Sequence, residues 1–270
     1  MSFVSESSQQ TLARVDGWGI NIADQAAAVS QIIRAAQHGD AFSVVTLNLD
    51  HVVQLRHNAE FRHAYRLASY VTADGAPIAM LASRQGVQVE RTTGADLVVP
   101  LCEAAAHEKL SIFLFGSSNG VLASAGQVLS HCTGYELDIV GTEAPRQGFD
   151  PTGPEADAAI ERIAASGANI CFVALGAPKQ EIFAARAVEK GVRVGFVCIG
   201  AALDFLAGQQ PRAPELLQKN GFEWLWRLST NPRRLTGRYA RCALVLGDLV
   251  IATATSEWRK AARREVRRPS

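Results

Sequence analysis

Short apolar segments of strand length alternate with helical segments through most of this 270-residue chain. The apolar segments are rich in β-branched and aromatic residues and comprise residues 42–48, 70–73, 111–115, 136–141, 169–176 and 192–200. Helical patterns lie between them, as in NAEFRHAYRLA at 58–68. Strands that alternate with helices in this way predict an α/β domain with a mostly parallel sheet. Because the strands are almost continuously apolar, we expect helices on both faces of that sheet.

Polar residues and glycines gather where these strands end. They are Thr46, Asn48, Asp74, Gly116, Gly176 and Gly200. In an open α/β sheet, ligands bind beyond the carboxyl ends of the strands. The pattern therefore predicts that residues far apart in the sequence form one site.

The pattern changes after about Leu206, where arginine and proline become frequent. We therefore expect residues 1–208 to form the α/β catalytic domain and residues 209–270 to form a helical, arginine-rich appendage. From Arg227 to Ser270 there are eleven Lys or Arg against three Asp or Glu, although the whole chain has a net charge of only +1. A basic segment on an acidic body predicts an anionic partner, such as phosphate, anionic lipid or nucleic acid.

Tryptophans and an apolar run within the appendage favour a membrane surface over nucleic acid as that partner. They are Trp224, Trp226, Trp258 and the segment 244–251. The longest apolar stretch, 242–254, contains Asp248 and is shorter than the ~20 residues a spanning helix needs. Residues 1–10 have neither the basic nor the apolar part of a signal peptide. We therefore expect a cytoplasmic protein that lies peripherally on the inner face of the cytoplasmic membrane.

The five cysteines are far apart and form no Cys-x-x-Cys pair, so we expect reduced thiols in the core of a cytosolic protein. Two enzyme classes are disfavoured by incomplete motifs. Gly116 to Gly120 matches the G-x-S-x-G turn of serine hydrolases, but the last histidine, His131, follows Ser118 by only 13 residues. Gly195 to Gly200 has the spacing of a phosphate-binding loop but lacks the Lys and Ser or Thr that should follow.

A metal site is not predicted. His51, His57 and His63 are six residues apart, so on a helix they would point in different directions. The chain also lacks a D-x-D motif. Each histidine is therefore expected to be solvated or to cap a helix, and no metal or other cofactor is expected.

Asp74 stands between a predicted strand and Gly75, which suits a general base beside a glycine that admits a ligand. The alternative is an ordinary Asp-Gly turn. The segment 176–181 (GAPKQE) reads as a helix start, with Pro178 and Glu181 in its first turn. Lys179 and Gln180 could donate to a phosphate or a sugar hydroxyl, and Asp204 could accept from a uracil or a ribose.

Four arginines of the appendage follow at helical spacing, and Pro232 is expected to interrupt the helix among them. They are Arg227, Arg234, Arg238 and Arg241. A cationic stripe can stabilise a departing diphosphate where no metal is present. The alternatives are a solvated face or an attraction to lipid or nucleic acid.

Taken in order, the motifs resemble those of the WecG/TagA/CpsF glycosyltransferases over about residues 18–241. The resemblance is carried by TLNLDH (46–51), ADG (73–75), ERTTGADL (90–97), FLFGSSNG (113–120), GAPKQE (176–181), IGAALDFLAG (199–208), RAP (212–214), EWLWRL (223–228) and NPRR…RY (231–239). It implies an inverting, metal-independent transferase with a Rossmann-like core, a UDP-sugar donor and a polyprenyl-diphosphate-linked acceptor.

The resemblance also implies roles for individual residues. Asp74 corresponds to the catalytic base, accompanied by Thr46 and Asn48. Nucleotide contacts map to Gly116, Ser117, Lys179, Gln180 and Asp204. Contacts to the diphosphate or the acceptor map to Arg91, Arg212, Arg227, Arg234 and Arg238.

The pattern looks closest to the xanthan-type, GumM-like branch of β-glucosyltransferases, which favours UDP-glucose and exopolysaccharide biosynthesis. The alternative donor is UDP-N-acetylmannosamine or its uronic acid, as in teichoic acid linkers or enterobacterial common antigen. A UDP-sugar-binding scaffold without turnover is the non-enzyme alternative. A nucleic-acid partner is not expected, and the oligomeric state, including a homo-oligomer, is left open.

Overall fold

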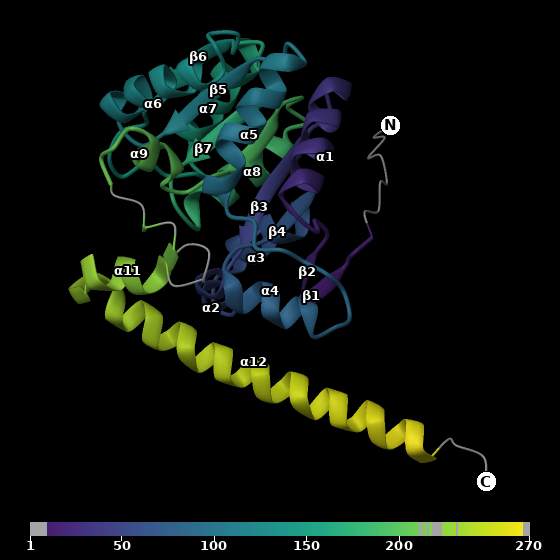
Figure 1. Cartoon of the computed structure of the whole chain (residues 1–270). Helices are drawn as coiled ribbons and strands as arrows, with labels where there is room; N and C mark the ends of the chain where they lie inside the picture. The colour runs from purple at the N-terminus through teal and green to yellow at the C-terminus, as the bar shows by residue number, and fades with distance from the viewer. Residues whose placement is uncertain (1–9, 211–212, 215, 218–222, 231, 267–270) are drawn as a thin grey trace.

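The computed structural model shows an α/β domain with a long helix at its C-terminal end (Figure 1). It describes residues 10–210, 213–214, 216–217, 223–230 and 232–266. The main sheet has six strands in the order β4-β3-β8-β7-β5-β6, and all neighbouring strands are parallel. The strands are β3 (Phe42–Leu47), β4 (Tyr70–Ala73), β5 (Ile112–Gly116), β6 (Ile139–Glu143), β7 (Ile170–Ala174) and β8 (Gly195–Cys198).

Helices cover both faces of the sheet and create two apolar cores. One core is formed with α1 (Gln25–His38), α5 (Gly94–His107), α6 (Asn119–Cys132) and α9 (Ala202–Leu206). The other is formed with α2 (Leu49–Leu55), α3 (Ala59–Leu67), α4 (Ala76–Ser83), α7 (Pro154–Ala165) and α8 (Lys179–Glu189). This arrangement confirms the expected fold class, a Rossmann-like parallel sheet flanked by helices.

The predicted strands lie close to the observed ones, although β6 and β8 each begin three residues later than their predicted segments. Strands β3, β4, β5, β7 and β8 are buried along their whole length, as their continuous apolar sequences indicate. Strand β6 begins at Ile139, three residues later than the predicted segment, and is only half-buried. It is an edge strand with one neighbour, so its sequence carries a weaker apolar signal.

The order in which the chain adds strands to the sheet reverses between β5 and β7. Strand β5 connects through α6 to β6 on one side, whereas β7 connects through α8 to β8 on the other. Helices α6 and α8 belong to the cores on opposite faces. In open α/β sheets, such a switch point opens a crevice at the carboxyl ends of the strands, and ligands bind there.

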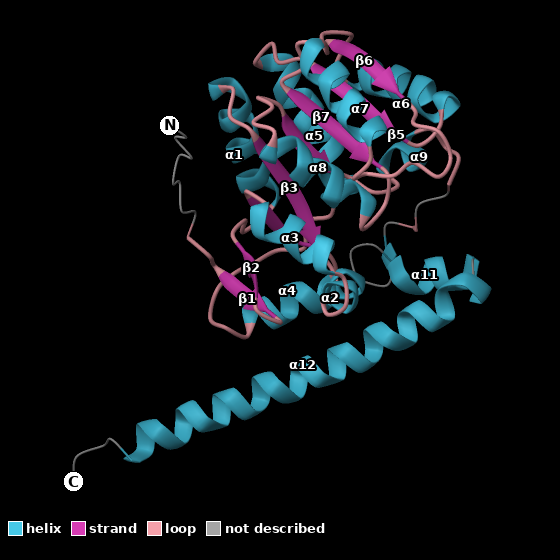
Figure 2. Ribbon diagram, turned by 180° about the vertical axis from the view of Figure 1, so that it is seen from behind, coloured by secondary structure: helices cyan, strands magenta, loops and turns pink. Residues whose placement is uncertain are grey.

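A short antiparallel hairpin precedes the main sheet, as Figure 2 shows beside α4. Strands β1 (Ala13–Val15) and β2 (Trp18–Ile20) are joined by Asp16 and Gly17, both with positive φ. That geometry is the tight turn that suits a two-residue hairpin. The hairpin adds Trp18 to the core that contains α3.

The appendage is helical, and its main helix packs against the α/β domain. Helix α11 (Glu223–Thr230) ends before Pro232, and α12 (Pro232–Val266) begins at it, so Pro232 marks a helix boundary as predicted. Helix α12 contacts α2 and α4, and Figure 1 shows it extending past them. Val245 and Leu249 of α12 are buried in the core shared with those helices. Among the described residues, no helix combines the length and apolar character needed to cross a bilayer.

The cysteines match the expectation of core thiols at four positions out of five. Cys102, Cys171, Cys198 and Cys242 are buried, whereas Cys132 is exposed at the C-terminal end of α6. The expectation is therefore wrong for Cys132, because it is the last residue of α6 and lies on the exposed side of a turn whose buried residue is Leu129.

Candidate active site

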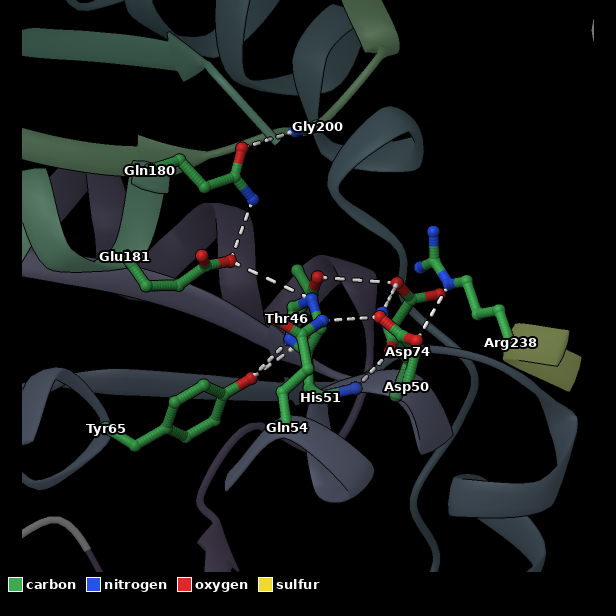
Figure 3. Close-up of polar contacts among 11 residues, drawn as sticks. Thr46, Asp50, His51, Gln54, Tyr65, Asp74, Gln180, Glu181, Gly200 and Arg238 are labelled. Carbon is green, nitrogen blue, oxygen red and sulfur yellow. Dashed lines mark hydrogen bonds and ion pairs between the residues drawn. The ribbon is translucent and has the colours of Figure 1, made fainter. Parts of the chain in front are cut away.

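The carboxylate of Asp74 is held by two side chains from the end of the neighbouring strand (Figure 3). Asn48 Nδ2 donates to Asp74 Oδ2 at 3.2 Å, and Thr46 Oγ1 donates to the same oxygen at 3.4 Å. Strands β3 and β4 are parallel neighbours, so their carboxyl ends bring these residues together. Donors to the ionised form favour a carboxylate over a carboxylic acid. The three predicted residues thus form one group, joined by hydrogen bonds to the Asp74 carboxylate.

The geometry of α2 determines which way the Asn48 amide faces. Asn48 is the N-cap of α2, and its Oδ1 accepts from the backbone N–H of His51 at 2.9 Å. Since the amide oxygen is used by the cap, the amide nitrogen is the atom that faces Asp74. One residue therefore begins the helix and holds the carboxylate. Gly75, at φ 94°, lets the chain turn from β4 into α4 directly after Asp74.

An arginine of α12 reaches the same region through Asp50. Arg238 Nε lies 2.8 Å from Asp50 Oδ1, and Gln54 Nε2 donates to Asp50 Oδ2 at 2.6 Å. Beside this contact is a cavity of about 760 Å³, lined by α2, the start of α3, α12 and Ala177 of the loop before α8. Arg241 also lines it. The cavity has two carboxylates, Asp50 and Glu60, on the side of α2 and α3 and two arginines, Arg238 and Arg241, on the α12 side. Carboxylates can accept from hydroxyl groups, and arginines can donate to phosphate oxygens.

A second group lies at the β5 end of the sheet. Ser117 Oγ donates to Asp204 Oδ1 at 3.2 Å, which joins the turn after β5 to α9. Gly116 has φ 116°, and a Cβ there would collide with the backbone of Ala174 on β7. Only glycine allows the β5–α6 turn to lie this close to the switch point. The structure thus brings Gly116, Ser117 and Asp204 together.

Helix α8 begins shortly after the carboxyl end of β7. Lys179 Nζ donates to the Phe149 carbonyl at 2.8 Å, whereas Gln180 is only 3% exposed. Gln180 Oε1 accepts from the Gly200 N–H at 2.9 Å, so this side chain ties α8 to the end of β8. Gln180 Nε2 donates to Glu181 Oε1 at 2.8 Å. Both the oxygen and the nitrogen of the Gln180 side-chain amide therefore already have hydrogen-bond partners within the protein.

A buried polar cluster joins Gln180 to the Asp74 group. His51, on α2, is 4% exposed, and Glu181 is 1% exposed. The two side chains face each other, with His51 Nε2 3.9 Å from Glu181 Oε1. His51 Nδ1 lies 2.7 Å from the Tyr65 hydroxyl, which itself donates to the Thr46 carbonyl at 3.3 Å. Figure 3 shows this chain of contacts running from Gly200 to Thr46.

Burial changes the protonation of this cluster. Loss of solvation, with a smaller contribution from the charge of Arg238, lowers the pKa of His51 to about 3. Loss of solvation raises the pKa of Glu181 to about 7, although the hydrogen bond from Gln180 acts in the opposite direction. Burial also raises the pKa of Tyr65 well above its usual value. The imidazole is thus neutral, and Glu181 exchanges its proton near pH 7.

The family of the chain is decided by a comparison with known protein families. Residues 14–260 match the model of the glycosyl transferase WecG/TagA/CpsF family. The chain belongs to this family. It is therefore a glycosyltransferase, and membership of the WecG/TagA/CpsF family implies a nucleotide-sugar donor and an acceptor.

The remaining arginines predicted from the resemblance to the WecG/TagA/CpsF family are placed only in part. Arg91 lies beside the end of β4, where it forms an isolated parallel β-bridge with Ala73. Its Nη1 lies 3.3 Å from Asp96 Oδ2. Arg212 lies outside the described residues. Arg227 and Arg234 belong to α11 and α12, but their side chains lie outside the described part of the structure.

The hydrolase alternative also fails in three dimensions, which agrees with membership of the WecG/TagA/CpsF family. Ser118 is the N-cap of α6 and accepts from Val121 N at 3.4 Å. His131 lies in the last turn of α6, on the order of 20 Å away along the helix. Among the described residues, no group of three or more His, Cys, Asp or Glu side chains is arranged to hold a metal ion.

Three residues of the polar cluster were not predicted from the sequence. His51 is neither solvated nor a cap through its ring, so the expectation for this histidine is wrong. The sequence signal for the burial of His51 was its position beside Val52 and four residues before Leu55, which are both buried. Tyr65 and Glu181 each lie on a helix that is buried at those positions. His57 and His63 are exposed as expected, and His63 pairs with Glu189.

Proposed function

We propose that this protein is an inverting, metal-independent glycosyltransferase that moves a sugar from a UDP-sugar to a polyprenyl-diphosphate-linked saccharide. The observation that carries the proposal is the Asp74 carboxylate, oriented by Asn48 and Thr46 at the carboxyl edge of the sheet. A carboxylate fixed by hydrogen-bond donors at the carboxyl end of a parallel strand, where open α/β sheets bind their ligands, has the position that a general base needs.

The reaction is a direct displacement. Asp74 takes the proton from an acceptor hydroxyl, the hydroxyl oxygen forms a bond to the anomeric carbon, and the bond from that carbon to the UDP oxygen breaks. Attack from the side opposite UDP inverts the configuration. A single displacement requires one base and no covalent intermediate, so Asp74 alone suffices.

The donor is assigned to the β5–β7 switch point. Gly116 and Ser117 lie where the backbone approaches most closely, and the N–H groups at the start of α6 suit a phosphate. Asp204, already hydrogen-bonded to Ser117, would accept from the uridine. Lys179 lies exposed at the start of α8, where its charge would stabilise the departing UDP.

The acceptor is assigned to the cavity between α2 and α12. Its arginines Arg238 and Arg241 suit the diphosphate of a lipid-linked saccharide, and the polar side of α2 suits sugar hydroxyls. Arg91, Arg212, Arg227 and Arg234 remain candidates for the same phosphates. UDP-glucose and an exopolysaccharide pathway of the xanthan type are favoured, with UDP-N-acetylmannosamine or its uronic acid as the alternative.

The acceptor is a membrane lipid, so we place the protein peripherally on the inner face of the cytoplasmic membrane. Two features of α12 support this assignment. Leu244 and Ile251 are 74% and 65% exposed and lie seven residues apart, so they share one face of the helix and could contact lipid together. The basic charge of residues 227–270 would attract an anionic lipid surface.

The proposal is tested by the Asp74→Asn variant, assayed with a panel of UDP-sugars and a polyprenyl-diphosphate-linked acceptor. A positioned base contributes roughly 10²–10⁴-fold to a rate. We therefore expect turnover to fall at least ~100-fold while UDP binding, measured by calorimetry, is retained. A variant with the wild-type rate would refute the base assignment. UDP-sugar binding by the wild type without any product would instead indicate a scaffold.

The same assay with EDTA tests the absence of a metal requirement. We expect the rate to persist, because arginine and lysine side chains are assigned to the departing diphosphate. A strict requirement for Mg²⁺ would contradict this part of the proposal.

A further inference from the structure

One of the two donors on Asp74, Thr46, is itself held by a pair of buried side chains, His51 and Tyr65. The Tyr65 hydroxyl donates to the carbonyl of Thr46, and the His51 ring meets that hydroxyl at 2.7 Å. The other donor, Asn48, is held by the backbone N–H of His51. The His51–Tyr65 side-chain contact therefore acts on Asp74 through Thr46.

The Tyr65 hydroxyl lies within hydrogen-bond distance of two groups, the Thr46 carbonyl at 3.3 Å and His51 Nδ1 at 2.7 Å. With its proton directed at the Thr46 carbonyl, the Tyr65 oxygen accepts from His51 Nδ1–H. His51 Nε2 faces Glu181, which is held by Gln180 from the end of β8. The contacts from Gly200 to Thr46 therefore form one continuous series.

Burying a polar cluster at this depth lowers the stability of the fold, so its presence indicates that its geometry has a role. Burying an imidazole, a phenol and a carboxyl removes their hydration, and apolar side chains of similar size would pack without that penalty. Glu181 Oε2 even lacks a hydrogen-bond partner within the described residues. Hydrogen bonds fix the direction of the groups that they join, whereas apolar packing does not.

We propose that His51 and Tyr65 are positioning residues for the reaction, whose side chains hold the backbone of Thr46 so that the Thr46 hydroxyl donates to Asp74 beside Asn48. This inference rests on the proposed function of Asp74 as the base. The hydrogen bonds that stabilise a carboxylate lower its pKa. Loss of the His51–Tyr65 contact would therefore misplace the base and raise its pKa, while the donor site at the β5–β7 switch point would be unchanged.

The Tyr65→Phe variant tests the proposal with the smallest change. It removes one oxygen and keeps the ring, which packs edge-on against Trp18 and Phe61. Tyr70→Phe is the matched control, because Tyr70 is a buried tyrosine on β4, the strand that precedes Asp74, and its hydroxyl lies near the Gln31 carbonyl on the opposite face. We expect kcat to fall about 10-fold in Tyr65→Phe, with the donor KM within about 2-fold of the wild type.

The pKa of Asp74 provides a readout that does not depend on knowing the sugar. It can be measured by carboxyl ¹³C NMR titration, with the signal assigned by its absence in Asp74→Asn. We expect this pKa to rise by about half a unit or more in Tyr65→Phe and to be unchanged in Tyr70→Phe. Asp50 and Arg238, the charged side chains drawn beside Asp74 in Figure 3, stay in place in both variants.

A double-mutant cycle separates positioning from general loss of packing. His51→Phe keeps a ring against Phe61 but removes both nitrogens. If the pair acts through one contact, Tyr65→Phe combined with His51→Phe should lose about as much as Tyr65→Phe alone. Losses that multiply, an unchanged Asp74 pKa in Tyr65→Phe, or an equal defect in Tyr70→Phe would overturn the proposal. If the wild type transfers no sugar, the proposed function fails while the NMR titration still decides the positioning role.

Discussion

At the scale of single residues, Glu181 is the clearest case of a side chain whose chemistry is changed by its surroundings. Burial raises its pKa to about 7, against the 4.5 usual for this group. The folded chain therefore binds this proton more tightly than the unfolded chain between about pH 4.5 and pH 7. Because the folded state binds more protons there, stability falls as pH rises through that window. The full penalty is reached above about pH 7.

Glu181→Gln should consequently stabilise the protein at alkaline pH. The variant removes the ionisation but keeps the shape, so we expect its free energy of unfolding at pH 8 to exceed that of the wild type by up to ~3 kcal/mol. At about pH 3.5 the variant and the wild type should be nearly equal in stability, because Glu181 is then largely protonated in both the folded and the unfolded wild type. Urea unfolding at the two pH values measures this difference. A constant difference at both pH values would show that Glu181 does not titrate in this window.

At the scale of elements, the junction between β3 and α2 combines a structural task with a proposed catalytic one. Asn48 ends the strand, caps the helix and donates to Asp74. A side chain at position 48 that caps α2 but does not donate to Asp74 would keep the fold and lose the orientation of the proposed base. The element boundary is therefore where stability and activity can be separated.

Asn48→Asp separates them directly. Aspartate caps helices about as well as asparagine, so we expect the thermal midpoint to change little. Its carboxylate would face that of Asp74 in place of a donor, and two like charges at this distance disfavour ionisation. We expect a loss of kcat of at least ~10-fold and an acid limb of the pH–rate profile that moves to higher pH.

Asn48→Ala is the companion variant to Asn48→Asp. It removes both the cap and the donor, and should cost about 1 kcal/mol of stability as well as activity. Full activity in Asn48→Asp would show that the amide donor is dispensable.

At the scale of the whole molecule, α12 is both an attached helix and a wall of the candidate acceptor cavity. Its buried side chains pack on α2 and α4, and it forms ion pairs from Asp248 to Arg56 and from Arg238 to Asp50. The six-stranded sheet and most of both cores lie within residues 13–208. The domain should therefore keep its fold without the appendage.

A chain ending at Gly208 tests this division. We expect it to remain folded by circular dichroism, with lower stability because the apolar surfaces of α2 and α4 lose their cover. Burial of each large apolar side chain contributes about 1.5–3 kcal/mol. Transfer to the lipid-linked acceptor should be abolished and binding to anionic vesicles reduced.

The matched full-length control for this truncation is Val245→Asp, which disfavours packing of α12 but keeps every arginine. If the truncated chain transfers sugar at the wild-type rate, the appendage has no part in the reaction.

Much of this protein could be predicted from its sequence, because the signals are local. Continuous apolar segments predicted the buried strands, and Pro232 marked a helix boundary. Parallel strands end at one edge, so the order of the strands and their terminal residues sufficed to assign Thr46, Asn48 and Asp74 to one site. The membership of the WecG/TagA/CpsF family, and with it the glycosyltransferase activity, is also carried by the sequence.

The tertiary structure alone decided which side chains are buried together. His51, Tyr65 and Glu181 come from three helices, and no local pattern places them against one another. Their protonation likewise depends on depth and on neighbours, since loss of hydration acts on a group only once other elements cover it. The same holds for the Asp50–Arg238 contact, whose partners are 188 residues apart in the chain. Sequence determines where the polar groups occur, whereas packing between elements determines their partners and their charge.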